Sequence, residues 1–447
     1  QVEFFTRSIT ATDFEATDVS SQSGTYSFTV NEADLDGVGL VFFVRAEDQA
    51  GNVAETEERT ISLTFPESSS PEISSITRFG GKVEDYEIIA IPFNFPGTGN
   101  RVQEIFNEYN GGIPDKTIWR LIKYNASTET EESNLEDLVA SSPIQIGAGY
   151  FFNAREAAEV KVGAAEVNTE DPQDIVLQPG WNLIGNPYII DIDWNSVLAR
   201  NGIAEVGPLR VIDPADPARW PESTLLSKYK GAFVNLMSTT AQTITFSYAD
   251  KIKPDGRIST PELPDYEWFV PISLHQENHS GLASVGMHAR ATTGVDALDA
   301  LTLPKWIRYL EISFDHPEFR YGDLSKDIVP PSEKYSWKFN ATSDQNGPTT
   351  LRWDHIAANI QSLKLLDISN QVMIDMSVQT AYTFSLNGTK RFKILYSTDP
   401  SEQFLSEQVN IGEAYPNPFD VQLTIPIALP VNSSSYDVTL ITTDLAG

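Results

Sequence analysis

The chain has 447 residues, of which 62 are acidic and 31 basic, so its formal net charge is -31. Nucleic acids and anionic membrane surfaces bind proteins through clusters of Lys and Arg, so this charge balance argues against both as partners. The absence of cysteine excludes disulfide bonds and thiolate metal sites.

Aromatic residues make up 11% of the chain, which is typical of packed β domains and argues against disorder. No apolar run reaches the length of a membrane-spanning helix, and the sequence from Gln1 lacks the pattern of a signal peptide. We therefore expect a mature or truncated product without a membrane span. The expected fold class is mainly β, with several β-sandwich modules in series and a central duplicated β-rich module that carries short helices.

The first module covers residues 1–65, where segments of strand length alternate with turn-rich segments. Its run Val41-Phe-Phe-Val-Arg-Ala-Glu-Asp48, followed by Gln49-Ala-Gly-Asn52, resembles the late strands of a bacterial immunoglobulin-like or fibronectin-like module. Such a sandwich has about seven strands, so we expect the first ones to lie upstream of Gln1. Turn chemistry explains Asp48 and Asn52 more simply than a calcium site does.

Residues 66–80 begin with Pro66-Glu-Ser-Ser-Ser-Pro71, a stiff polar segment that predicts a linker. Residues 81–255 contain an internal repeat, with copies at about 81–165 and 175–255. In this repeat Ile88-Ile-Ala-Ile-Pro-Phe93 matches Leu183-Ile-Gly-Asn-Pro-Tyr188, and Gly149-Tyr-Phe-Phe-Asn153 matches Gly231-Ala-Phe-Val-Asn235. We expect the two copies to pack face to face around a shared core.

Each copy is predicted to contain a short helix. The first is expected over residues 101–109, where four apolar residues share one face, and it stops at Gly111. In the second copy, Asp193 is the expected cap of a helix that ends before Gly202.

Residues 261–400 show the most regular alternation of apolar and polar residues in the chain. This pattern predicts seven or more strands of an antiparallel β-sandwich. Asn387-Gly388 lies between two predicted strands, so we expect a hairpin turn that sets their pairing.

The sequence contains few candidates for catalysis or metal binding. His275 and His279 have the spacing of a zincin pair, but the residues around them predict a hairpin loop rather than a helix. There is no Gly-x-Ser-x-Gly elbow, phosphate-binding loop or thiol. We therefore predict no catalytic residue, no metal ligand and no cofactor.

Two carboxylate pairs in the large sandwich form a further set of candidates. Asp296 with Asp299, and Asp323 with Asp327, have the chemistry of a general acid and base or of calcium ligands. In so acidic a chain such pairs arise by chance, and solvated loop charges explain them more simply.

Exposed aromatic residues would indicate sugar binding by a β-sandwich. Trp268, Trp337 and Trp353 fall on the apolar faces of predicted strands and are expected in the core. Trp220, beside Pro221, is the candidate for an exposed aromatic.

Residues 412–447 contain Glu413-Ala-Tyr-Pro-Asn-Pro-Phe419, then Thr424-Ile-Pro-Ile-Ala-Leu-Pro430 and Asp444-Leu-Ala-Gly447. The prolines of the first segment impose a stiff, extended entry to a strand. In this order the segments resemble the start of the C-terminal sorting domain of proteins exported by the type IX secretion system of Bacteroidota-type bacteria, whose pattern continues into further strands. The resemblance implies that eight residues carry the signal: Tyr415, Pro416, Asn417, Pro418, Phe419, Asp444, Leu445 and Gly447.

The resemblance implies a non-catalytic C-terminal region of a protein that is secreted or held on the outer surface of a Gram-negative bacterium. Its modules are expected to act as a stalk and adhesion array. The implied partners are the type IX translocon and sortase, with surface polysaccharide or lipopolysaccharide in addition. Two alternatives stay open: a carbohydrate-binding accessory region of a hydrolase whose catalytic domain lies upstream, or a hydrolase that uses loop carboxylates of the large sandwich.

Overall fold

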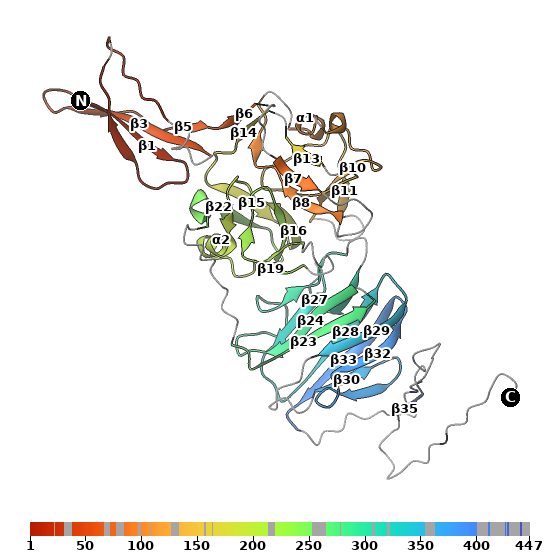
Figure 1. Ribbon diagram of the computed structural model, residues 1–447. Helices are drawn as coiled ribbons and strands as arrows, with labels where there is room; N and C mark the ends of the chain where they lie inside the picture. The colour runs from red at the N-terminus through yellow and green to blue at the C-terminus, as the bar shows by residue number, and fades with distance from the viewer. Residues whose placement is uncertain are drawn as a thin grey trace. The chain divides into compact units, whose positions relative to one another are not determined.

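A computed structural model describes the chain as two compact units, Gln1–Leu263 and Pro264–Gly447 (Figure 1). The expected fold class is confirmed, because the protein is mainly β and its described residues contain only two α-helices, α1 (Val102–Ile105) and α2 (Trp194–Asn201). The residues that the structure describes are 1–21, 23–30, 38–66, 72–76, 85–96, 100–107, 109–126, 134–155, 158–162, 164–212, 220–252, 265–277, 279–305, 309–319, 322–353, 363–399, 410–411, 425, 427–428 and 439.

The N-terminal part of the first unit is a five-stranded sheet of β1 (Val2–Ser8), β2 (Glu15–Asp18), β3 (Gly39–Glu47), β4 (Val53–Glu55) and β5 (Arg59–Ser62). Within the described part of residues 1–65 this single sheet carries half-buried phenylalanine rings, such as Phe5 stacked on Phe43 at 4.6 Å. The turn after β3 forms as its residues predict. The Asp48 carboxylate accepts hydrogen bonds from the amides of Ala50 and Asn52 at 2.8 and 2.9 Å.

Two short strands lie beyond this sheet, in and next to the segment expected to be a linker. They are β6 (Thr64–Phe65) and β7 (Glu72–Ile76). The first pairs with β14 (Ala165–Val167), which also pairs with β9 (Phe93–Asn94), and the second pairs with β13 (Ala158–Lys161). The strand β7 therefore extends the first copy of the repeat into residues 66–80.

The two copies of the repeat have the same strand connectivity. In the first, β8 (Glu87–Ala90), β10 (Trp119–Tyr124), β11 (Leu135–Asp137) and β12 (Gly149–Ala154) form a sheet of order β11-β10-β12-β8. In the second, β16 (Gly180–Gly185), β18 (Leu209–Arg210), β19 (Glu222–Ser223) and β21 (Gly231–Leu236) form one of order β19-β18-β21-β16. A separate pair, β15 (Gln173–Leu177) with β22 (Gln242–Phe246), is the counterpart of β7 with β13, and β17 (Ile192–Asp193) pairs with β20 (Leu225–Leu226).

The copies meet through equivalent backbone contacts. The amide of Ala90 donates to the carbonyl of Tyr229 at 2.8 Å, and the amide of the matching residue, Gly185, donates to the carbonyl of Gly147 at 2.9 Å. Tyr229 in the second copy corresponds to Gly147 in the first, as Gly185 corresponds to Ala90. The two hydrogen bonds are therefore equivalent, as they would be across a two-fold interface. Buried residues of both copies belong to one continuous core, as expected from the sequence.

Of the two predicted helices, α2 has the predicted ends and α1 is shorter than predicted. Helix α2 begins after Asp193, whose carboxylate accepts from the amide of Asn195 at 3.2 Å, and ends at Gly202 in the left-handed region, as predicted. Helix α1 is shorter than the expected 101–109. The chain folds back after it, so that a Cβ added at Gly112 would lie 2.2 Å from the carbonyl oxygen of Gln103.

The second unit contains an 11-stranded sheet (Figure 1). Its order is β31-β30-β33-β28-β26-β27-β24-β23-β29-β32, with β25 paired to β27. The strands are β23 (Trp268–Gln276), β24 (His279–Met287), β25 (Ala300–Leu301), β26 (Leu310–Phe314), β27 (Leu324–Val329), β28 (Lys334–Ser343), β29 (Gly347–Trp353), β30 (Leu363–Asp367), β31 (Val372–Asp375), β32 (Ala381–Leu386) and β33 (Thr389–Ser397).

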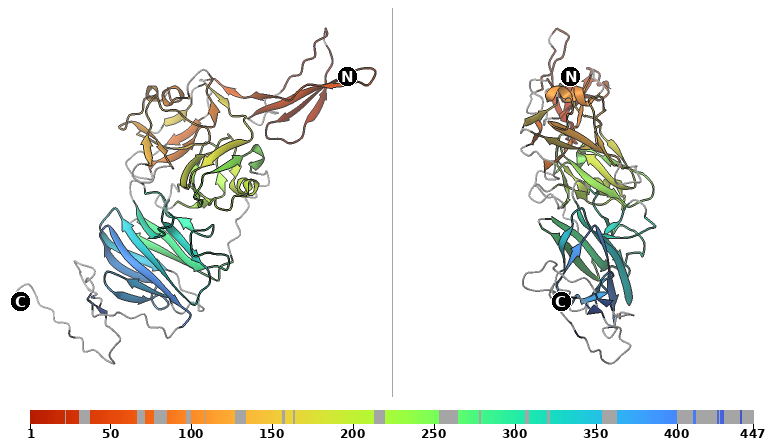
Figure 2. Two further views of the ribbon diagram at one scale, coloured as in Figure 1. Left: turned by 180° about the vertical axis from the view of Figure 1, so that it is seen from behind. Right: turned by 90° about the vertical axis from the view of Figure 1, so that its right-hand side faces the viewer.

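This sheet folds over into a sandwich, which further views show from other sides (Figure 2). Trp268 of β23 and Trp337 of β28 are four steps apart in the strand order, yet their ring centroids lie 5.6 Å apart. At the other end, Phe384 of β32 and Phe392 of β33 lie 4.9 Å apart. The two halves of the sheet therefore face each other across a shared core of aromatic rings.

Two details of this sandwich differ from the sequence prediction. The pair β24 and β27 is parallel, so the sandwich is not wholly antiparallel. The hairpin expected at Asn387-Gly388 is wrong, because β32 pairs with β29 while β33 pairs with β28 and β30. The turn instead carries the chain from one layer to the other, with Gly388 at φ 70°.

In the C-terminal segment the structure describes one strand pair, β34 (Asn410–Ile411) with β35 (Ile427–Ala428). The second of these strands lies inside residues 424–430, part of the segment that resembles a sorting domain.

Candidate functional site

All eight residues of the expected sorting signal lie outside the described residues. These are Tyr415, Pro416, Asn417, Pro418, Phe419, Asp444, Leu445 and Gly447. The structure therefore contains no geometry for them, and the sorting signal stays a prediction.

His275 and His279 lie in the hairpin that joins β23 to β24, as the sequence predicts. Gln276 is directly opposite His279 in this pair. Opposite residues share a face of the sheet and adjacent residues point to different faces, so the two histidines lie on opposite faces. They cannot bind the same metal ion.

The carboxylates Asp296 and Asp299 fasten the loop before β25 to β27. Asp299 accepts hydrogen bonds from the amides of Ile328 and Asp296, both at 2.8 Å, and Asp296 accepts from the amide of Leu298 at 2.9 Å. The expectation of a solvated loop charge is wrong for Asp299, which is 7% exposed. Its burial raises its pKa to about 7, and the nearby charges of Asp296 and Asp327 act in the same direction.

Asp327, on β27, forms an ion pair that the sequence analysis did not anticipate. Its carboxylate lies 3.0 Å from Nε2 of His316, and Nδ1 of the same ring lies 2.7 Å from Glu318. The hydrogen bond to Asp327, aided by that to Glu318, raises the pKa of His316 to about 9 despite its partial burial. Because both ring nitrogens then carry protons, His316 is a poor general base at neutral pH.

Asp323 precedes β27, and its backbone carbonyl accepts a hydrogen bond from the amide of Thr302 at 2.8 Å. The electrostatic partners of Asp327 include His316 and Asp299.

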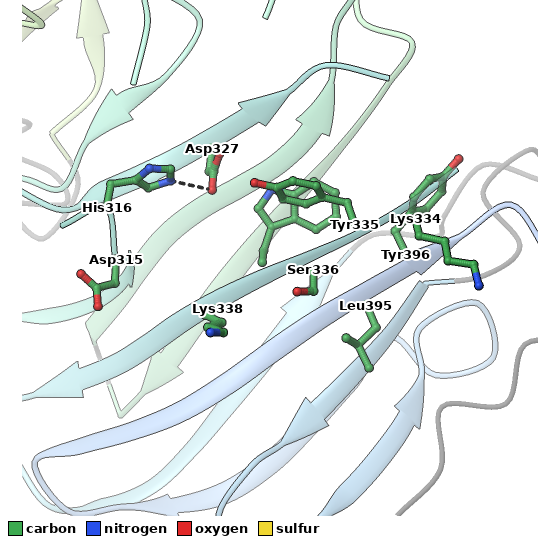
Figure 3. A pocket seen from close by; sticks show the side chains of 10 residues that line it. Asp315, His316, Asp327, Lys334, Tyr335, Ser336, Lys338, Leu395 and Tyr396 are labelled. Carbon is green, nitrogen blue, oxygen red and sulfur yellow. Dashed lines mark hydrogen bonds and ion pairs between the residues drawn. The ribbon is translucent and has the colours of Figure 1, made fainter. Parts of the chain in front are cut away.

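His316 and Asp327 line one end of a pocket of about 620 Å³, with Asp315 beside them (Figure 3). Lys334 and Tyr396 lie at the other end. The complete lining set is Asp315, His316, Asp327, Lys334, Tyr335, Ser336, Trp337, Lys338, Leu395 and Tyr396.

The pocket exists because β26 is shorter than its neighbour β28. Strand β26 ends at Phe314, which pairs with Phe339. On that side, residues 334–338 of β28 have no strand partner among the described residues, and the sheet opens between β28 and β27. Side chains of both faces of β28 reach the opening, which explains why five consecutive residues line it.

Aromatic rings form the inner wall of the pocket. Tyr335 and Tyr396 are directly opposite each other on β28 and β33. The ring of Trp337 lies 4.7 Å from that of Tyr335, and Trp268 lies 5.1 Å from Tyr396. Burial raises the pKa of Tyr335, and the acidic groups Asp327, Asp299 and Glu318 add to that effect.

Two indole groups in this wall have unsatisfied hydrogen-bonding capacity. Trp337 is 1% exposed and Trp268 is 9% exposed, and the Nε1 atom of each has no hydrogen-bond partner among the described residues. Buried indole N–H groups usually find an acceptor. Both Nε1 atoms are inaccessible to solvent, and Trp268 is not one of the residues that line the pocket.

Sequence analysis placed Trp268 and Trp337 in the core, and the structure confirms this burial, as it does for Trp353 at 4% exposed. Trp220, the candidate exposed aromatic, is 9% exposed and packs 5.2 Å from Phe233 in the second copy of the repeat. The prediction of an exposed ring at Trp220 is therefore wrong.

Sequence analysis did not identify the other pocket residues. His316, Tyr335 and Tyr396 lie far apart along the chain, and none belongs to a recognisable motif. The available signal was the pair of tyrosines on the apolar faces of two predicted strands, but their pairing could not be predicted from the pattern.

No protein-family model, curated protein or solved structure matches this chain. Within the described residues, no group of three or more histidine, aspartate or glutamate side chains is arranged to hold a metal ion. None of the helices in the described part of the chain has the length and apolar character required to cross a membrane.

Proposed function

We propose that this chain is the non-catalytic C-terminal region of a secreted or cell-surface protein. Its β-rich units serve as stalk and adhesion modules, and residues 412–447 carry a type IX sorting signal. The single observation that carries the export half is the order of the Pro-Asn-Pro-Phe turn, the Leu-Pro strand end and the Asp-Leu-x-Gly segment. The partners are then the type IX translocon and sortase.

The chemistry of the candidate acids supports a non-catalytic role. Asp299 uses both carboxylate oxygens to accept backbone amides, and Asp327 is paired with a protonated His316. A glycosidase needs one carboxyl group free to protonate the leaving group and a second free to act as base or nucleophile. These bonds occupy the groups that such a hydrolase would use.

A reporter experiment tests the export half. A fluorescent protein with a signal peptide is joined to residues 401–447, together with any residues that follow them in the gene, in a bacterium that has the type IX system. The fusion should reach the medium or the cell surface, and a variant with Pro416→Ala, Asn417→Ala and Phe419→Ala should stay in the periplasm.

The matched control replaces Ser433, Ser434 and Ser435 by alanine in the same segment, and we expect it to be exported. Equal export of the Pro-Asn-Phe variant would show that these residues carry no sorting information.

The pocket of the second unit favours the carbohydrate-binding accessory region as a second candidate function. It combines half-buried tyrosine rings with charged and hydroxyl groups at an open edge of a β-sandwich. Recognition of this kind suits either an adhesion module or an accessory region of an upstream hydrolase.

A further inference from the structure

The pocket between β27 and β28 contains both an apolar surface and polar groups. Tyr335 and Tyr396 lie side by side on its inner wall, and both are half-buried. The face of an aromatic ring is electron-rich, so it attracts the weakly positive C–H groups that cover one face of a pyranose ring. The tyrosine pair is therefore suited to the apolar face of a sugar.

The polar groups around this wall suit hydroxyls. Ser336 and the carboxylates of Asp315 and Asp327 line the pocket. The amide of Thr398 donates to the carbonyl of Glu333, which fixes which residues of β28 form hydrogen bonds with β33. In an antiparallel pair only every second residue does so. The amides of the residues between them, among them Ser336 and Lys338, therefore face away from β33 and toward the opening. Hydroxyl groups both donate and accept hydrogen bonds, so they can bond with these donors and with the carboxylates.

The formal charges of the pocket nearly balance. Two acidic side chains, Asp315 and Asp327, line it against three basic ones, and the acidic Glu318 lies beside it on His316. The basic side chains are His316, Lys334 and Lys338. A site for a strongly anionic ligand would carry an excess of positive charge, so this balance favours an uncharged ligand.

We propose that this pocket binds a hexopyranose unit of a neutral polysaccharide, with the sugar ring against Tyr335 and Tyr396 and its hydroxyls bonded to Asp327 and Ser336. The inference rests on the adhesion half of the proposed function and names its ligand class and its site. A volume of about 620 Å³ is within the usual range for small-ligand sites.

Native gel electrophoresis of the purified 447-residue chain tests this site. Gels contain one soluble polysaccharide each: amylopectin, mixed-linkage β-glucan, galactomannan and xyloglucan as neutral probes, and alginate and chondroitin sulfate as acidic probes. At least one neutral polysaccharide should retard the chain. Tyr396→Ala and Tyr335→Ala should each weaken that retardation about tenfold or more.

Two further variants separate binding from folding. Ser336→Arg places a bulky side chain at an exposed pocket position without changing the core, and it should abolish retardation even if the aromatic variants are destabilised. Phe269→Ala removes an exposed ring of the same unit outside the pocket and should bind like the unchanged chain. Near-UV circular dichroism checks that each variant is folded.

Three results would overturn the proposal: no retardation by any neutral polysaccharide, retardation by acidic polysaccharides alone, or normal retardation of folded Ser336→Arg and Tyr396→Ala chains. The purified chain does not depend on export. Failure here therefore leaves the sorting signal untouched, and failure of the reporter experiment leaves the sugar site untouched.

Discussion

His316 illustrates how one side chain makes the stability of the second unit depend on pH. Its contacts with Asp327 and Glu318 raise its pKa from the ordinary 6.5 to about 9. A group whose pKa is raised by folding stabilises the folded state fully below its ordinary pKa and loses that contribution as pH rises through the higher value. The ion pair therefore contributes most below pH 6.5 and is lost by about pH 9.

Asp299 acts in a lower pH window. Folding raises its pKa from 3.8 to about 7 by burial. The folded state then holds a proton that the unfolded chain has already lost, so stability falls as pH rises between these values. Together the two groups predict a decline of stability from acidic to alkaline pH, in two separable steps.

We expect two substitutions to remove these steps one at a time. His316→Gln should flatten the decline between pH 6.5 and 9, reducing the change in unfolding free energy by on the order of 1–2 kcal/mol, because its second partner, Glu318, is exposed and screened by solvent. Asp299→Asn should flatten the decline below pH 7 and leave the upper step. Urea unfolding of residues 264–447 at a series of pH values measures both. A slope unchanged in His316→Gln between pH 6.5 and 9 would contradict the assignment.

At the scale of elements, the contact between the two copies of the repeat depends on missing side chains. A Cβ added at Gly231 would lie 2.6 Å from Cγ2 of Ile88 in the first copy, and one at Gly185 would lie 2.4 Å from the carbonyl oxygen of Ala148. Both glycines belong to the matched segments of the repeat. They allow strands of different copies to approach closely enough for the symmetric backbone hydrogen bonds.

The segment Gly180-Trp-Asn-Leu-Ile-Gly-Asn-Pro-Tyr188 also has a role in local packing, which its buried asparagine shows. The amide group of Asn186 donates to the carbonyls of Ile190 and Leu226 at 2.7 and 2.9 Å, and its oxygen accepts the amide of Tyr188 at 2.9 Å. Asn186 is fully buried. Its side chain therefore holds the turn after β16 against β20, which gives this motif a structural role.

Gly231→Ala should therefore destabilise the first unit by about 1–3 kcal/mol, because the added methyl group forces the two copies apart. Thermal unfolding of the whole chain measures the loss in the transition of the first unit. Gly294→Ala in the whole chain is the matched control, since its Cβ would meet nothing within 4 Å. A Gly231→Ala unit as stable as the unchanged one would show that the close approach is not required.

At the scale of the whole molecule, each compact unit contains its own large set of buried apolar residues. The core of the first unit includes Trp119, Trp194 and Phe246, while that of the second includes Trp337 and Phe392. A unit with its own core should fold without the rest of the chain.

We therefore expect residues 1–263 and 264–447, produced separately, each to unfold in one cooperative transition. Differential scanning calorimetry of the whole chain should then show two transitions at the temperatures of the separate units. A unit that gives no transition on its own, or a shift of its midpoint by more than about 5 °C in the whole chain, would show that the units stabilise each other.

Local patterns in the sequence determined much of this fold. Period-two alternation predicted the strands of the second unit, and the matched segments predicted two copies with one core, because both signals record which residues must be buried. The cap at Asp193 and the turn at Asp48 were predictable for a related reason. Each depends on side chains within a few residues of the backbone groups that they bind.

Only the tertiary structure decided which strands are neighbours and where the pocket lies. The turn at Asn387-Gly388 joins two layers, although its residues are those of a hairpin. The reason is that β32 pairs with β29 and β33 pairs with β28, so the two strands do not pair with each other. The pocket likewise depends on β26 ending before β28 and on Tyr335 meeting Tyr396 across a strand pair. Such long-range pairings follow from the packing of the whole unit, which no local pattern of residues encodes.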